Sequence, residues 1–154
     1  MKLIIPDVNP EEYSNPKLRK KIQQFLKLLN AINQKEITKE VEVELNGIIS
    51  EIYFNQSEDK ELTKVLSKAK SKILSILEKK LKIVSKNHYR NQWMVLGMSI
   101  FGVSLGTAFG VALGNMGLLG IGLPIGMAIG LAIGTGMDKK TLDQGLQLDF
   151  ENSF

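Results

Sequence analysis

The spacing of apolar residues predicts an amphipathic helix in the first part of the chain. From Pro16 onwards, apolar side chains recur at intervals of three and four residues, at Leu18, Ile22, Phe25, Leu26, Leu29 and Ile32. This spacing is typical of one face of a helix, here over roughly 16–33. Asn15 before Pro16 is a typical N-cap followed by proline at the first helical position, and Asn9 before Pro10 predicts another helix start.

Two more amphipathic segments follow. Thr38 predicts the cap of a second helix that ends near Asn55. Apolar residues alternate with charged ones at its start, so a strand over 40–46 is the alternative; helix is preferred because the three- and four-residue spacing continues beyond it. A third helix is expected to begin near Ser57. No proline or glycine follows until Gly97, which allows this helix to continue into the next segment as one rod.

The pattern changes completely after Arg90, because the 47 residues before Asp138 include no charged side chain. Residues 93–114 are enough to span about 30 Å of hydrocarbon as a helix. Asn and Gly at 115–117 predict a turn. A second apolar helix is expected over about 120–137, with Pro124 in its first turn. The sequence therefore predicts a transmembrane helical hairpin.

Each of these two helices carries glycine at every fourth position. The glycines are Gly102, Gly106, Gly110 and Gly114 in the first helix and Gly122, Gly126, Gly130 and Gly134 in the second. Glycine inside a helix costs about 1 kcal/mol relative to alanine in water, so eight such positions are poorly suited to a soluble helix. In lipid, a row of small residues lets two helix backbones approach closely. We therefore expect these glycines to mediate helix packing and oligomerisation.

Charge is distributed unevenly around the apolar region. Residues 1–90 carry a net charge of +6 and residues 138–154 carry −2. Aromatic and basic residues at the two outer flanks are expected at the membrane–water interface, namely Tyr89, Arg90, Trp93, Lys139 and Lys140. By the positive-inside rule, both termini of this multi-pass membrane protein are predicted to be cytosolic.

A row of lysines, Lys60, Lys64, Lys68 and Lys72, lies along the third predicted helix. It is either a solvated helix face or a surface attracted to anionic lipid headgroups. Nucleic acid is a weaker alternative and is not expected as a partner, because lysine dominates over arginine and no aromatic residues interleave with the basic ones before Tyr89.

The chain offers little catalytic chemistry. Cysteine is absent and His88 is the single histidine. Gly120, Gly122 and Gly126 do not have the spacing of a dinucleotide-binding loop. The apolar segment has no charged residue that could act as a proton relay. The sequence therefore predicts no catalytic residue, metal site or cofactor, and indicates that the protein is not an enzyme.

The two four-glycine rows resemble those of bacterial glycine-zipper transmembrane hairpin proteins, a group that includes channel-forming toxins. The resemblance covers about residues 93–138. It implies tightly packed membrane helices and homo-oligomerisation, and, as in some members, permeabilisation of a membrane.

Together these patterns predict an all-α protein. Residues 1–90 form a soluble amphipathic helical module, residues 91–138 a transmembrane glycine-zipper hairpin, and residues 139–154 a short acidic cytosolic tail. The expected function is that of a self-associating membrane protein that perturbs or permeabilises a bilayer, as a pore-forming toxin or defence effector does. The alternative is a non-lytic anchor that presents a protein-binding module. Expected partners are the lipid bilayer, further copies of the chain, and a protein partner or immunity protein bound through 1–90.

Overall fold

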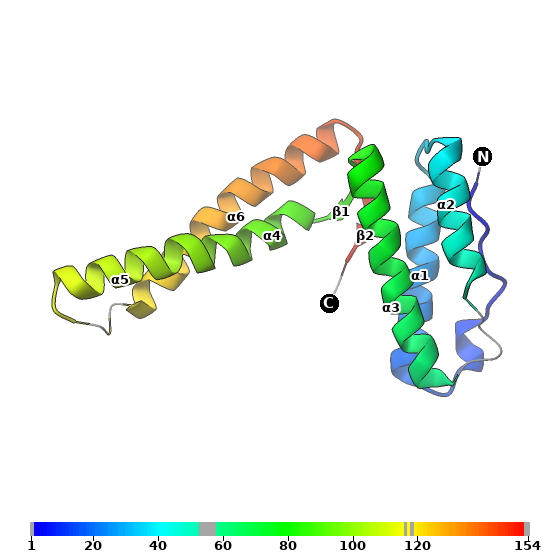
Figure 1. Cartoon of the computed structure of the whole chain (residues 1–154), viewed down its shortest axis with the longest axis horizontal. Coiled ribbons are helices and arrows are strands. Elements are labelled where there is room, and N and C mark those ends of the chain that lie inside the picture. Colours follow the sequence, from blue (N-terminus) through cyan, green and yellow to red (C-terminus); the bar gives the residue numbers. More distant parts are fainter. Residues whose placement is uncertain (1, 53–57, 116, 118, 153–154) are drawn as a thin grey trace. The chain divides into compact units, whose positions relative to one another are not determined.

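The computed structural model describes residues 2–52, 58–115, 117 and 119–152, and the chain divides into two compact units (Figure 1). The first unit consists of residues 1–84 together with 148–150. The second consists of residues 85–147 and 151–154. The protein is mostly helical, as expected.

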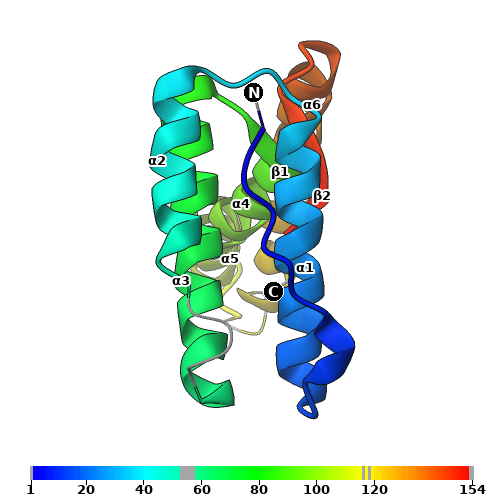
Figure 2. The ribbon, with the colours of Figure 1, turned by 90° about the vertical axis from the view of Figure 1, so that its right-hand side faces the viewer.

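The first unit is built on three helices, α1 (Pro16–Asn33), α2 (Lys39–Ser50) and α3 (Asp59–Ile76), which lie side by side in Figure 2. A short 3-10 helix (Pro10–Glu12) precedes α1, and a π-helical turn (Leu77–Leu81) extends α3. The helix predicted over 16–33 is confirmed, and α2 is helical rather than a strand. The expected end near Asn55 and start near Ser57 lie outside the described residues.

The apolar faces of these helices form one buried core. Each helix contributes residues three or four positions apart, as their sequence spacing predicts. The core residues are Leu18, Ile22, Phe25, Leu28, Leu29 and Ile32 from α1, Val41, Leu45, Ile48 and Ile49 from α2, and Leu62, Leu66, Ala69 and Ile73 from α3. Burial of these side chains supplies the main driving force for folding of this unit.

An extended segment at the N-terminus runs along α1 and α2 (Figure 2). The amide of Leu3 donates to Oδ1 of Asn33 at 2.6 Å, and the amide of Ile4 donates to Oδ1 of Asn46 at 2.9 Å. The side chain of Leu3 is buried. Two asparagine side chains thus accept the hydrogen bonds of backbone amides in this extended segment.

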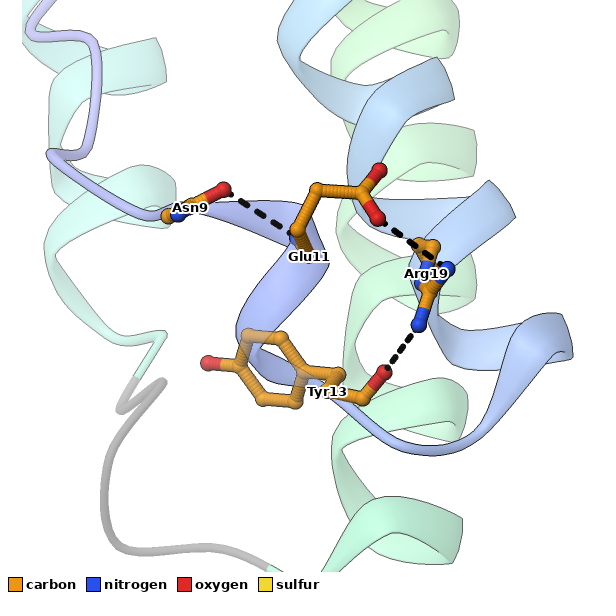
Figure 3. A network of polar contacts seen from close by, with 4 residues as sticks. All are labelled: Asn9, Glu11, Tyr13 and Arg19. Carbon is orange, nitrogen blue, oxygen red and sulfur yellow. Dashed lines mark hydrogen bonds and ion pairs between the residues drawn. The ribbon is translucent and has the colours of Figure 1, made fainter.

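Polar contacts fix the chain where it enters α1 (Figure 3). Oδ1 of Asn9 accepts a hydrogen bond from the amide of Glu11 at 3.1 Å, as expected for an N-cap. The guanidinium of Arg19 lies 3.0 Å from the carboxylate of Glu11 and donates to the carbonyl of Tyr13 at 3.1 Å. Arg19 therefore has its charge partner inside this unit.

The expectation of one continuous rod from the third helix into the apolar region is wrong. Lys82 and Asn87 both adopt a left-handed backbone conformation, with φ of 57°. A residue in the left-handed conformation ends an α-helix, because the backbone that follows it leaves the helical path. The strand β1 (Val84–Lys86) lies between these two residues.

The expectation of an all-α protein is confirmed in part: the protein is mostly helical, but β1 pairs with a second strand, β2 (Gln147–Glu151). The region expected to be an acidic tail from 139 differs accordingly: the last helix continues to Asp143 and β2 follows. Leu148 and Phe150 are only 1% and 5% exposed, whereas Asp149 between them is exposed. This alternation is typical of a strand with one buried face.

Leu148 and Phe150 belong to the first unit, so removing either side chain is expected to loosen it. Leu148→Ala or Phe150→Ala should lower the free energy of unfolding by about 2–5 kcal/mol through lost burial and a residual cavity. Hydrogen exchange of the α1 and α3 amides in the full chain measures this effect. Asp149→Ala, on the exposed face of the same strand, is the matched control. Equal exchange in Leu148→Ala and in the control would contradict the assignment of β2 to this core.

The second unit contains two long helices packed as a hairpin (Figure 1). The first is continuous through α4 (His88–Gly97), a π-helical turn (Met98–Gly102) and α5 (Val103–Ala112). The second is α6 (Leu119–Asp143). Pro124 is the sixth residue of α6, whereas it was expected in the first turn. At this position a residue normally donates its backbone N–H to the carbonyl four residues earlier, here that of Gly120. Proline has no N–H, so this hydrogen bond is missing.

Candidate functional site

The contact between the two hairpin helices is lined by glycine. Gly102 and Gly106 are buried on the first helix, and all four glycines of the predicted second row are buried on α6. The buried glycines of the hairpin are Gly97, Gly102, Gly106, Gly110, Gly122, Gly126, Gly130 and Gly134. Apart from Gly114, the structure thus brings the two predicted rows face to face within a single chain.

At Gly122, Gly126, Gly130 and Gly134 on α6, the backbones approach too closely for a side chain. A methyl group added to Gly126 would lie 2.6 Å from Cα of Gly102, and one added to Gly134 would lie 2.5 Å from Cα of Arg90. A methyl group at Gly130 would collide with the backbone of Trp93. These neighbours are backbone atoms, which cannot move aside as a flexible side chain can. Glycine is therefore sterically required along most of the contact.

Gly97 belongs to the same contact, although the four-residue spacing did not reveal it. A methyl group there would lie 2.7 Å from Cα of Gly130. Gly97 precedes Gly102 by five residues, and the π-helical turn Met98–Gly102 accommodates the additional residue. Because a π-helical turn inserts one residue into the helical repeat, it keeps both glycines on the face that contacts α6.

Gly114 differs from the other glycines of its predicted row. It is exposed, and its φ of 63° lies in the left-handed region where glycine is favoured. It was expected to end the first membrane helix, but it follows the end of α5 at Ala112 and directly precedes the turn predicted at 115–117. In this turn, Oδ1 of Asn115 accepts a hydrogen bond from the amide of Gly117 at 2.9 Å.

A buried carboxylate closes the opposite end of the hairpin. Asp138 on α6 is 7% exposed, and its two carboxylate oxygens accept hydrogen bonds from the amides of Tyr89 at 3.0 Å and Arg90 at 2.9 Å. These amides belong to the first turn of α4, where backbone N–H groups have no partner within the helix. Asp138 therefore caps α4 from the other helix, and its negative charge lies at the positive end of the α4 dipole.

The predicted interface residues gather at this same end. Tyr89, Arg90 and Trp93 lie in the first two turns of α4, and Lys139 and Lys140 directly follow Asp138 on α6. Arg90 and both lysines are exposed, while Tyr89 and Trp93 are half-buried. The rings of His88 and Tyr89 meet edge-to-face with centroids 5.0 Å apart. The end of the hairpin that leads to the strands is thus basic and aromatic.

Away from the glycine contact, the hairpin surface is apolar. Its exposed large side chains include Val95, Leu96, Ile100, Val103, Val111, Ile121, Leu123 and Ile125. Ser99 and Thr107 donate their hydroxyl hydrogens to the carbonyls of Val95 and Val103 four residues earlier, at 2.9 Å each. Residues 88–112 and 120–143 are helices long and apolar enough to cross a membrane.

Within the described ranges, no three His, Asp or Glu side chains are grouped so that they could hold a metal ion. Comparison with protein families, curated proteins and solved structures finds no match to this chain.

Proposed function

We propose that this chain is an integral membrane protein whose glycine-packed hairpin anchors the helical module of the first unit to a bilayer. The observation that supports this proposal is that small and large side chains lie on different faces of the hairpin. Its buried glycines lie at the contact between the two helices of one chain, whereas many of its large apolar side chains are exposed. An outward apolar surface of this extent is unfavourable in water and is satisfied by lipid.

The polar groups of the hairpin support an anchor more than a conducting path. The hydroxyls of Ser99 and Thr107 are bonded to their own helix, which is the usual way to satisfy such groups in an apolar environment. The residues between Arg90 and Asp138 bear no charge that could attract ions into a path.

Permeabilisation by a self-associating toxin or defence effector is the second candidate. Each helix carries a further row of small, exposed residues two positions beyond its glycine row, hence on the opposite side of the helix. The rows are Ser104, Ala108 and Ala112 on α5 and Ala128, Ala132 and Gly136 on α6. Small residues at four-residue spacing favour helix association in membranes, so these rows are where copies of the chain would meet.

Membrane insertion is tested by labelling single cysteines in intact cells, because the chain has no cysteine of its own. Val43→Cys in the first unit and Asn115→Cys in the hairpin turn both occupy exposed positions. An impermeant thiol reagent is expected to label the turn from outside and to reach Val43→Cys only after lysis, since basic flanks favour the cytosol. Complete release of the protein by carbonate extraction would contradict the membrane proposal.

The two candidates are separated by inducible expression in a bacterium. An anchor is expected to accumulate in the membrane without change in membrane potential or growth. Rapid depolarisation on induction would favour the toxin or effector instead. Ala132→Leu, which blocks the outer row on α6, should abolish that depolarisation if copies of the chain must meet there.

A further inference from the structure

Positive charge is concentrated on two of the three helices of the first unit. α1 carries five basic residues and no acidic residue, and α3 carries five lysines against Asp59 and Glu61. α2 instead carries three glutamates and one lysine. The first unit therefore has one strongly basic pair of helices and one acidic helix.

Among the described residues, the ion pairs of this unit leave Lys21 on α1 and Lys70 on α3 without a carboxylate partner. Lys80 lies 2.6 Å from the carboxylate of Glu40 and 2.9 Å from that of Glu44, so it pairs with two of the three glutamates of α2. These contacts hold the pKa of Lys80 above its ordinary value. Arg19 is paired with Glu11. In the part of the chain that the structure describes, no carboxylate forms an ion pair with Lys21 or Lys70.

A hydrogen bond holds Lys21 of α1 against Ser67 of α3, near enough to Lys70 for the two lysine charges to interact. The ammonium of Lys21 donates a hydrogen bond to Oγ of Ser67, which in turn donates to the carbonyl of Thr63 at 2.9 Å. Ser67 lies one turn before Lys70 on α3. Partial burial, followed by the charge of Lys21, lowers the pKa of Lys70 below its ordinary value. Two like charges in a partly desolvated position are unfavourable, and an anion placed between them relieves both costs.

We infer that Lys21, Ser67 and Lys70 form a binding site for the phosphate group of an anionic lipid headgroup. Lysine binds phosphate as a compact point charge, and two ammonium groups close together favour the negative charge of a phosphodiester headgroup such as that of phosphatidylglycerol. Lys17 lies one turn before Lys21, and Lys64 lies one turn before Ser67, so further lysines extend the basic face along both helices. A chain anchored in a bilayer lies next to lipid headgroups, so we assign the phosphate to a lipid. This assignment rests on the proposed function.

The test uses the full chain in lipid nanodiscs. A dye on Ser71→Cys, an exposed position next to Lys70, reports energy transfer to labelled lipid headgroups. Transfer is expected to be higher in discs of phosphatidylcholine with phosphatidylglycerol than in phosphatidylcholine alone, and to fall with added salt. Equal transfer in both kinds of disc would overturn the inference.

Paired substitutions locate the site. Lys21→Gln with Lys70→Gln should lower the ratio of docked to free first unit by about fivefold per lysine, roughly 30-fold for the pair. Lys27→Gln with Lys39→Gln removes the same charge at exposed positions elsewhere and is the matched control. Equal losses in the two double variants would assign the effect to net charge and overturn the site.

Two further measurements separate the possible failures. Displacement by inorganic phosphate beyond that by sodium chloride at equal ionic strength would assign the site to a soluble phosphate and overturn the lipid assignment. Retention of the chain in discs after carbonate treatment is measured in parallel. Loss of the chain from the discs contradicts the proposed membrane anchor, whereas retention without lipid-dependent energy transfer contradicts the headgroup site alone.

Discussion

Replacing Gly126 or Gly130 by alanine is expected to separate the two hairpin helices. A methyl group at either position meets backbone atoms closer than real Cβ contacts allow, so the helices must move apart along their whole contact. Overpacking of this kind costs about 1–3 kcal/mol for each added group, and leucine should cost more than alanine. Spin-label distances between the two helices, measured in detergent and in lipid, should lengthen and broaden.

Gly120→Ala and Gly136→Ala are the matched controls, because a methyl group at either position meets nothing within 4 Å. Both lie on α6, as Gly126 and Gly130 do. Alanine is favoured over glycine in a helix by about 1 kcal/mol, so the controls should be neutral or slightly stabilising. If Gly126→Ala and Gly136→Ala gave the same distance distribution, the close backbone contact would be refuted.

Removal of the Asp138 carboxylate is expected to open the basic end of the hairpin. Asp138→Ala leaves the amides of Tyr89 and Arg90 without their acceptors in a part-buried position. An unsatisfied buried donor costs about 1–3 kcal/mol, so hydrogen exchange of these two amides should accelerate by about tenfold or more. Asp138→Asn keeps one oxygen acceptor and loses the charge, and should fall between wild type and Asp138→Ala.

Asp143→Ala controls for loss of negative charge, since Asp143 is an exposed carboxylate near the end of the same helix. It should leave exchange at Tyr89 and Arg90 unchanged. Unaltered exchange in Asp138→Ala would show that the two hydrogen bonds do not hold this end of the hairpin.

Local patterns in the sequence were sufficient to predict the helices. The spacing of Leu18, Ile22 and Phe25 predicts α1 with its bounds, because a helix that packs on one side repeats its buried face every 3.6 residues. The glycine rows predict a hairpin contact for a similar reason. Gly97 was missed because its side of the helix depends on a π-helical turn, which no residue pattern in Met98–Gly102 marks.

Features that depend on distant partners were not predicted. Leu148 and Phe150 alternate with polar residues, which is a pattern typical of a strand. The segment 147–151 is short and contains acidic residues, however, so the same sequence is also compatible with an irregular acidic tail. In the sequence, Asp138 marks the end of the uncharged region, and nothing in its neighbours indicates that it caps a helix. Its role depends on the position of the α4 amides 48 and 49 residues away, which the sequence alone does not give.

The place of β2 in the fold sets an order of events during synthesis. Residues 148–150 complete the core of the first unit, yet the ribosome makes them after both hairpin helices. Domains usually fold as they emerge, from the N-terminus onwards. Until the hairpin has been translated, the apolar surface of α1, α2 and α3 that residues 148–150 cover in the native fold therefore stays exposed. Completion of the first unit is therefore a late step that follows emergence of the hairpin.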